Sequence, residues 1–209
     1  MIRIKSVVLA LCVACSMAVY AGQASHVSAL QKQWANATYV LKGDAKEKAF
    51  ITLLQQADKA VLEKPESADV LVWRGIIKSS FAGVKGGLSA LSLIKEAKTD
   101  LEQSMLLDES ALSGSAYTSL GTLYFKAPGW PLSFGDDEKA KELLEKALAI
   151  NPHGIDSNYF YAQFLGDNNQ PVLAKRFYIQ AQQAPKRPGR LMADKGRQAE
   201  IVAALNKLH

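Results

Sequence analysis

Small and apolar residues recur along this chain at a helical spacing. The stretch 97–104 and the stretch 140–147 carry a small residue, Lys, Leu, Glu and a second small residue at matching places, 43 positions apart. A repeat of this length is typical of arrays in which each repeat is one supersecondary unit. The pattern predicts that each stretch is the second helix of a helix pair.

Nine helices account for the hydrophobic pattern, and no strand is needed. They are predicted at 25–41, 44–63, 67–82, 88–107, 111–126, 136–150, 154–165, 171–184 and 190–208. Asp44, Ser67 and Asp136 precede three of these segments and are suited to N-caps, because their side chains can accept a hydrogen bond from the first turn. The predicted fold class is all-α, an antiparallel helix-pair array wound into a superhelix.

The helix pairs resemble tetratricopeptide repeats. In the clearest unit, Leu120, Gly121 and Tyr124 stand where that family has Leu-Gly-x-x-Tyr in its first helix. Small residues, a leucine, a tyrosine and prolines that end second helices continue the frame: Ala60, Pro65, Gly75, Ala140, Leu144, Ala147, Pro152, Ala162, Ala174, Tyr178, Ala181 and Pro185. The resemblance implies a tetratricopeptide-like array of three units with partial helices at each end. First helices are then expected to line its concave side, and its open ends could support self-association.

The repeat frame divides the chain into four segments. They are a signal peptide at 1–21, N-terminal helices at 22–66, tetratricopeptide-like repeats at 67–186 with an insertion at 127–136, and a basic C-terminal capping helix at 187–209.

The first segment has the pattern of a secretory signal peptide. Arg3 and Lys5 precede an uncharged apolar run at 7–19, which is shorter than the roughly 20 residues that span a bilayer. Ala21 offers a small residue for cleavage, so we expect export to the periplasm. An uncleaved anchor is one alternative. A lipid on Cys15 is another, although Cys12 stands where a lipobox has Leu.

Charge and cysteine content narrow the chemistry. The formal net charge is +5, and the segment from Pro171 onwards carries eight basic against two acidic side chains. A basic C-terminal face could contact a membrane surface or an acidic partner, or could simply be solvated. Nucleic acid is not an expected partner of an exported protein. Both cysteines, Cys12 and Cys15, lie in the leader, so no thiol chemistry is expected after cleavage.

A Pro- and Gly-rich insertion interrupts the clearest repeat. It contains Pro128, Gly129, Trp130, Pro131 and Phe134, and its large rings are expected to pack on something. With the helix that follows, the insertion resembles the signature of the T-component proteins of tripartite ATP-independent periplasmic transporters. The resemblance implies a periplasmic helical array, association with a solute-binding protein, and a hydrophobic ligand pore.

Six aromatic residues are the candidate binding residues. Trp130 and Phe134 could form a lid or a docking surface, or could plug the end of a helix pair. Tyr117 and Tyr124 lie two turns apart on one predicted helix, and Tyr159 and Tyr161 crowd the next first helix. These four tyrosines could line the concave groove, or could serve core packing alone.

The expected function is binding, not catalysis. The histidines His26, His153 and His209 are dispersed, and no metal signature, nucleophile motif or phosphate loop is found. We therefore expect no enzyme activity, no cofactor and no metal. The leading hypothesis is a periplasmic scaffold or transporter-accessory subunit that binds a partner protein. The alternatives are a carrier of a small hydrophobic ligand in an internal cavity and an envelope assembly factor.

Overall fold

A computed structural model describes residues 26–208 of the chain. A first helical segment at 26–39 is followed by α2 (Gly43–Glu63), α3 (Ala68–Lys85), α4 (Gly87–Leu107), α5 (Ala111–Lys126), α6 (Asp137–Ile150), α7 (Ile155–Asp167), α8 (Pro171–Gln182) and α9 (Leu191–Lys207). The described residues contain no strand. The all-α, tetratricopeptide-like fold class is thereby confirmed. The predicted signal peptide and Cys15 lie outside the described residues.

Three predicted local features are wrong. Asp44 is not an N-cap, because α2 already begins at Gly43 and its N-cap residue, Lys42, makes no side-chain capping bond. The third predicted helix does not end at residue 82, because α3 continues through Gly83 to Lys85 and is capped by Gly86, whose φ is +65°. The start of α5 is not right-handed, because Leu112, Ser113 and Gly114 have φ values of 49°, 57° and 72°. A regular right-handed helix begins only after this left-handed turn.

Three antiparallel helix pairs form the body of the array: α3 with α4, α5 with α6, and α7 with α8. The first two pairs meet at a glycine in the same way. A Cβ at Gly75 would stand 2.8 Å from Leu101 Cγ, and a Cβ at Gly121 would stand 2.8 Å from Leu144 Cγ. Glycine is needed at both positions because a larger residue would hold the two helices apart.

A buried carboxylate joins α3 to α4. Asp100 is 2% exposed and accepts hydrogen bonds from Arg74 at 2.9 and 2.5 Å. Lys78 Nζ lies 3.0 Å from the same carboxylate. Asp58 pairs with Arg74 at 3.5 Å and Glu96 pairs with Lys78 at 3.3 Å, so each buried charge has partners of opposite sign.

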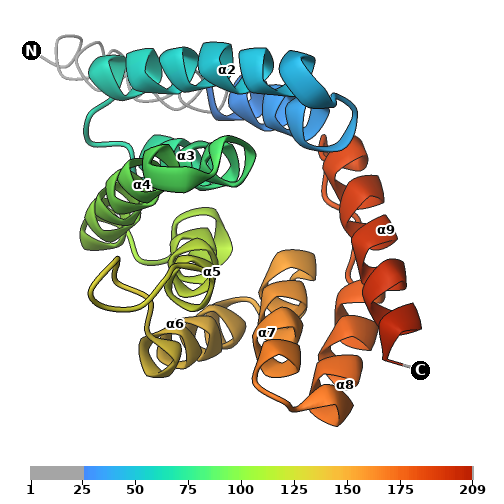
Figure 1. Ribbon diagram of the computed structural model, residues 1–209. Coiled ribbons are helices and arrows are strands. Elements are labelled where there is room, and N and C mark those ends of the chain that lie inside the picture. Colours follow the sequence, from blue (N-terminus) through green and yellow to red (C-terminus); the bar gives the residue numbers. More distant parts are fainter. Residues whose placement is uncertain (1–25, 209) are drawn as a thin grey trace, which may run out of the picture.

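The array curls until its two ends meet, as the ring of helices in Figure 1 shows. Ala193 of α9 belongs to the same hydrophobic cluster as Trp34 of the first helical segment. Gly196 of α9 lies so close to the Tyr39 ring that a Cβ there would overlap it. The expectation of open ends is therefore wrong for this chain, because α9 packs on the N-terminal helices as well as on the last repeat.

None of the helices in the described part of the chain has the length and hydropathy needed to cross a membrane.

Candidate functional site

A pocket of about 530 Å³ is lined by residues from all around the ring, and we call it the central pocket. The first helices of the three units, α3, α5 and α7, supply most of its wall, and no lining residue comes from α4, α6 or α8. The first helical segment, the loop before α7, the α8–α9 connection and α9 complete it. This agrees with the implication of the repeat resemblance that first helices line the concave side. Ring closure turns that concave side into a pocket.

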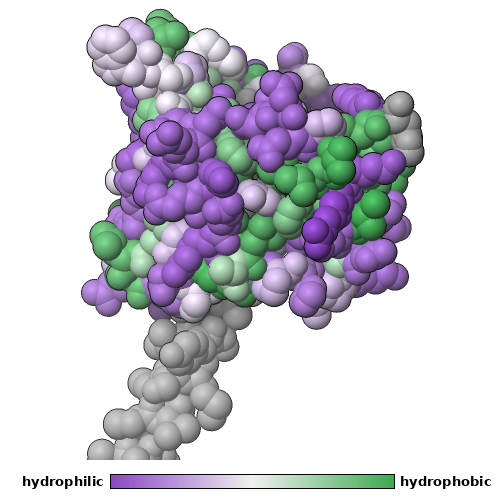
Figure 2. All heavy atoms as spheres, turned by 90° about the horizontal axis from the view of Figure 1, so that it is seen from below, coloured by the Kyte–Doolittle hydropathy of each residue, from purple (hydrophilic) through white to green (hydrophobic). Residues whose placement is uncertain are grey.

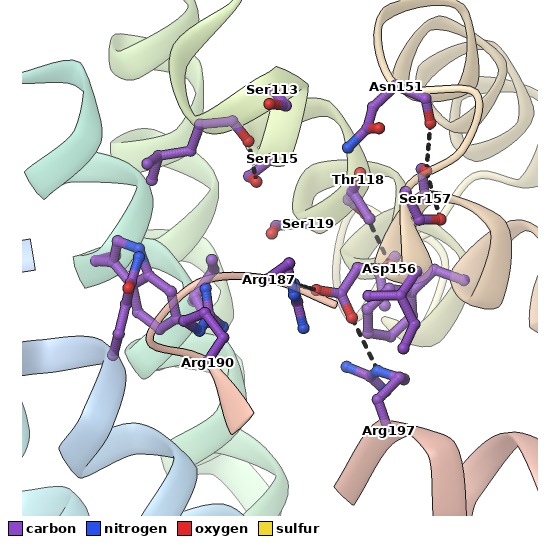
Figure 3. A pocket seen from close by; sticks show the side chains of 18 of the residues that line it. Ser113, Ser115, Thr118, Ser119, Asn151, Asp156, Ser157, Arg187, Arg190 and Arg197 are labelled. Atoms are coloured by element: carbon purple, nitrogen blue, oxygen red, sulfur yellow. Dashed lines mark hydrogen bonds and ion pairs between the residues drawn. The ribbon is translucent and has the colours of Figure 1, made fainter. Parts of the chain in front are cut away.

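Hydroxyl groups form one side of the central pocket. Ser113, Ser115, Thr118, Ser119 and Thr122 come from α5, and Figure 3 shows the first four of them on the same side of the space. The Ser115 and Thr122 hydroxyls donate to carbonyls of their own helix, at 2.6 and 2.8 Å. The Ser119 hydroxyl bonds to none of the described residues, so it can both donate to and accept from a guest.

Arginines and one carboxylate form the opposite side (Figure 3). Asp156 accepts from Arg187 Nη1 at 2.6 Å and from Arg197 Nε at 2.9 Å. Burial alone would raise the pKa of the Asp156 carboxyl, but the two guanidinium groups outweigh it and hold that pKa well below its usual range. Asp156 therefore stays ionised and holds both arginines in place.

Arg187 and Arg197 have further anionic and aromatic partners. Arg187 Nε donates to Asp194 at 2.7 Å, and Arg197 Nη1 donates to Glu200 at 2.6 Å. The Arg197 guanidinium also lies 4.2 Å from the centre of the Tyr159 ring and makes a cation–π contact with it. Each of these two arginines is thus paired with two carboxylates of the protein itself.

An apolar wall adjoins these polar groups. Trp34 and Trp73 meet edge to face at 5.8 Å, and Trp34 Nε1 donates to Ser80 at 2.8 Å. Ile76, Leu112, Leu123, Ile155, Phe160 and Pro185 extend the apolar lining. The pocket therefore presents an apolar surface, a row of hydroxyls and an arginine cluster within one space.

The left-handed start of α5 borders the same space. Leu112 and Ser113 line the pocket, and their positive φ angles place two non-glycine residues in a region that costs about 1–3 kcal/mol each. Backbone strain of this kind persists where the surrounding structure determines it, and it gathers at binding sites. Its position here supports the central pocket as the functional site.

The four candidate tyrosines lie outside the lining of the central pocket. Tyr159 and Tyr161 are buried in the C-terminal hydrophobic cluster, where burial and the Glu145 hydrogen bond raise the pKa of Tyr161 to about 12. Tyr117 donates to Glu109, and Tyr124 meets Phe134 edge to face at 5.2 Å. Core packing and surface contacts account for these positions, and a binding role for any of them stays a prediction.

The insertion separates its two rings. Phe134 packs on Tyr124 and lies 5.9 Å from the Lys98 ammonium, so it covers the end of the α5–α6 pair. The expectation that the other ring also packs is wrong, because Trp130 is 90% exposed. Trp130 is left available to another molecule.

The sequence pattern predicted which helices line the concave side, but it did not predict which of their side chains line the pocket. Arg187, Arg190 and Arg197 were counted as part of a basic tail, yet all three turn inward. The run of Ser and Thr from Ser113 to Thr122 was a visible signal. Hydroxyls at i, i+3 and i+4 of a first helix mark a polar stripe on the face where a core helix would carry apolar residues.

A second surface feature lies on the outside of the ring. In Figure 2 hydrophobic side chains gather on the right-hand side, where α8 and α9 lie. The exposed large apolar side chains of these two helices are Val172, Leu173 and Ile179 of α8 and Leu191, Met192 and Val202 of α9. Exposed apolar patches are typical of protein contact faces.

Comparison with known proteins finds likeness only at the level of architecture. No protein-family model matches the sequence, and no curated protein matches it. A solved structure described as the crystal structure of MamA is 18% identical, covering 81% of this chain and 94% of that chain with a TM-score of 0.46. A second, the crystal structure of MamA protein, is 17% identical over 88% of this chain and 91% of that chain, with a TM-score of 0.45. The resemblance to transporter T-components stays a prediction.

Proposed function

We propose that this protein is a non-catalytic binding protein that holds one small organic molecule in its central pocket. The observation that carries the proposal is ring closure, which makes one pocket of about 530 Å³ out of a concave face. That volume lies within the range of about 300–1,000 Å³ that is usual for small-molecule sites. The walls come from the first helices of three repeats, the first helical segment, the α8–α9 connection and α9.

The mixed lining favours an amphipathic guest over a purely hydrophobic one. Trp73, Ile76 and Leu123 would contact an apolar part, and hydroxyls and arginines would orient a polar part. Ligand sites commonly combine a largely apolar wall with a few polar groups that determine specificity. The small hydrophobic ligand implied by the transporter resemblance is therefore refined to a molecule with a polar end.

Native mass spectrometry of the protein purified from envelope extract tests this function. We expect one small molecule to co-purify and to be released on denaturation. Ser119→Leu should abolish its capture, because Ser119 faces the open space and a leucine would fill part of it. Ser89→Leu, on the exposed start of α4, is the matched control and should retain the ligand. The proposal would be contradicted if both variants carried the same amount of bound small molecule, or if the wild-type protein carried none.

A second role, docking to a partner protein, is favoured by the exposed Trp130. Exposed tryptophans are enriched among residues that dominate protein interfaces. We propose that the protein acts in the periplasm after loss of 1–21, and that its partner contacts the insertion. Pull-down of a solute-binding protein from envelope extract should weaken with Trp130→Ala and stay unchanged with Ser89→Leu. Undiminished capture by Trp130→Ala would remove the insertion from the interface.

A further inference from the structure

Arg190 differs from the two other arginines of the central pocket because the protein gives it no anionic contact. Its guanidinium forms neither a hydrogen bond nor an ion pair with any residue in the described range 26–208, and its Nε is buried without a partner. It lies 5.0 Å from the centre of the Trp73 ring, and the indole Nε1 of Trp73 is likewise buried without a partner. Two donors without acceptors thus meet at one wall of the pocket.

The charges around Arg190 leave it short of compensation. Burial lowers its pKa first, and repulsion from Arg187 lowers it further. Asp156 and Asp194 attract it more weakly, and both are already hydrogen-bonded to Arg187. A guanidinium does not lose its proton in a protein, so the half-buried charge remains and favours a nearby anion.

The opposite side of the pocket offers the remaining contacts that such an anion needs. The Ser119 hydroxyl makes no bond within the described chain, and Figure 3 shows it across the open space from Arg187 and Arg190. Trp73 lies against Arg190 with its ring, and Ile76 adds apolar surface to the lining of the same pocket. An oxyanion held by a guanidinium and a hydroxyl could therefore carry an apolar body along the same wall.

We propose that the central pocket binds an organic anion, with a carboxylate or phosphate head on Arg190 opposite Ser119 and an apolar body against Trp73 and Ile76. This inference rests on the proposed function, since it names the ligand class of the same pocket. Arg187 and Arg197 act as positioning residues, because Asp156 already occupies them.

The test measures binding of octanoate, octyl phosphate and 1-octanol to the protein with Trp130→Phe. This background removes the exposed one of the three tryptophans, so fluorescence reports Trp34 and Trp73, which line the pocket. We expect an anion to bind roughly tenfold or more tightly than the alcohol, because a charge-assisted bond to Arg190 is available only to the anion. Arg190→Gln should remove this preference, while Arg176→Gln on the exposed face of α8 should leave it unchanged.

Each outcome decides between explanations. Preference for octanoate identifies a carboxylate head, and preference for octyl phosphate identifies a phosphate head; both support the proposal. Equal binding of alcohol and anions, unaffected by Arg190→Gln, would overturn it and leave the pocket function standing. If no probe binds, the anion proposal is wrong, and native mass spectrometry decides the pocket function separately. Should Arg190→Gln fail to fold, Arg190→Lys keeps the charge and should weaken the preference by losing the planar fork.

Discussion

At the scale of single residues, Asp156 organises the polar side of the pocket. Its two carboxylate oxygens hold Arg197 and Arg187, one from α9 and one from the connection before α9. Asp156 itself lies in the first turn of α7, so its carboxylate also faces the positive end of that helix. One side chain therefore links the last repeat to the capping helix.

Asp156→Asn should lower the free energy of unfolding at pH 7 by about 2–4 kcal/mol, because the buried Arg197 and the half-buried Arg187 lose a shared anion. The pKa of Asp156 is depressed in the folded state, so its stabilisation is complete above the ordinary Asp value of about 4 and is lost as the pH falls through the folded-state value. The gap between wild type and variant should accordingly narrow below about pH 4. Urea titrations at a series of pH values measure it.

The matched control for this prediction is Asp167→Asn. Asp167 pairs with Lys126 at 2.6 Å, but the two side chains are 57% and 48% exposed. An exposed pair of this kind contributes about 0–1 kcal/mol. A loss as large for Asp167→Asn as for Asp156→Asn would show that carboxylates in general, and not the Asp156 bridge, carry the effect.

At the scale of helices, the amino-acid pattern was sufficient to predict how the two helices of a pair pack, because they are close together in the sequence. Gly75 and Gly121 were identified by spacing, and both are contacts between the two helices of one unit. The left-handed turn at Leu112 and Ser113 was not foreseen, since no rule of periodicity distinguishes it from an ordinary first turn. The Ser113–Gly114 pair was the one local sign of irregular backbone there.

Gly121→Ala should destabilise the protein by about 1–3 kcal/mol, because the new Cβ would stand 2.8 Å from Leu144 Cγ and 3.2 Å from the Ala140 carbonyl. Gly83→Ala is the opposite case, with no atom within 4 Å of the new Cβ inside α3. That change should stabilise the protein by about 0.5–1 kcal/mol, because alanine loses less entropy in a helix. Chemical denaturation followed by circular dichroism compares the two. Changes of the same sign would argue against tight packing at Gly121.

At the scale of the whole molecule, ring closure and the pocket lay beyond the reach of the sequence pattern. Helical periodicity tells which face of α9 is apolar, but not that Gly196 meets Tyr39, 157 residues earlier in the chain. For the same reason Arg187 and Arg197 were counted as surface charges, although their partner Asp156 belongs to another element. Long-range pairing of this kind depends on the curvature that accumulates over three repeats.

Gly196→Ala should loosen the closed ring. Its Cβ would overlap the Tyr39 ring, which is held edge to face against Trp34 at 5.7 Å and cannot yield without disturbing that cluster. We expect α9 and the segment 26–39 to lose hydrogen-exchange protection, and the radius of gyration in small-angle scattering to rise, with repeats α3 to α6 unchanged. Gly166→Ala, whose Cβ would meet Ala174 at an ordinary 3.9 Å, is the control.

Ring closure should also matter for ligand binding. The pocket residue Trp34 belongs to the first helical segment and Arg190 directly precedes α9, so an opened ring would separate them and should bind octanoate or octyl phosphate more weakly. An opened ring with undiminished anion binding would place the ligand on the repeats alone, and a ring that stays closed in Gly196→Ala would show that the Tyr39 contact is not what closes it.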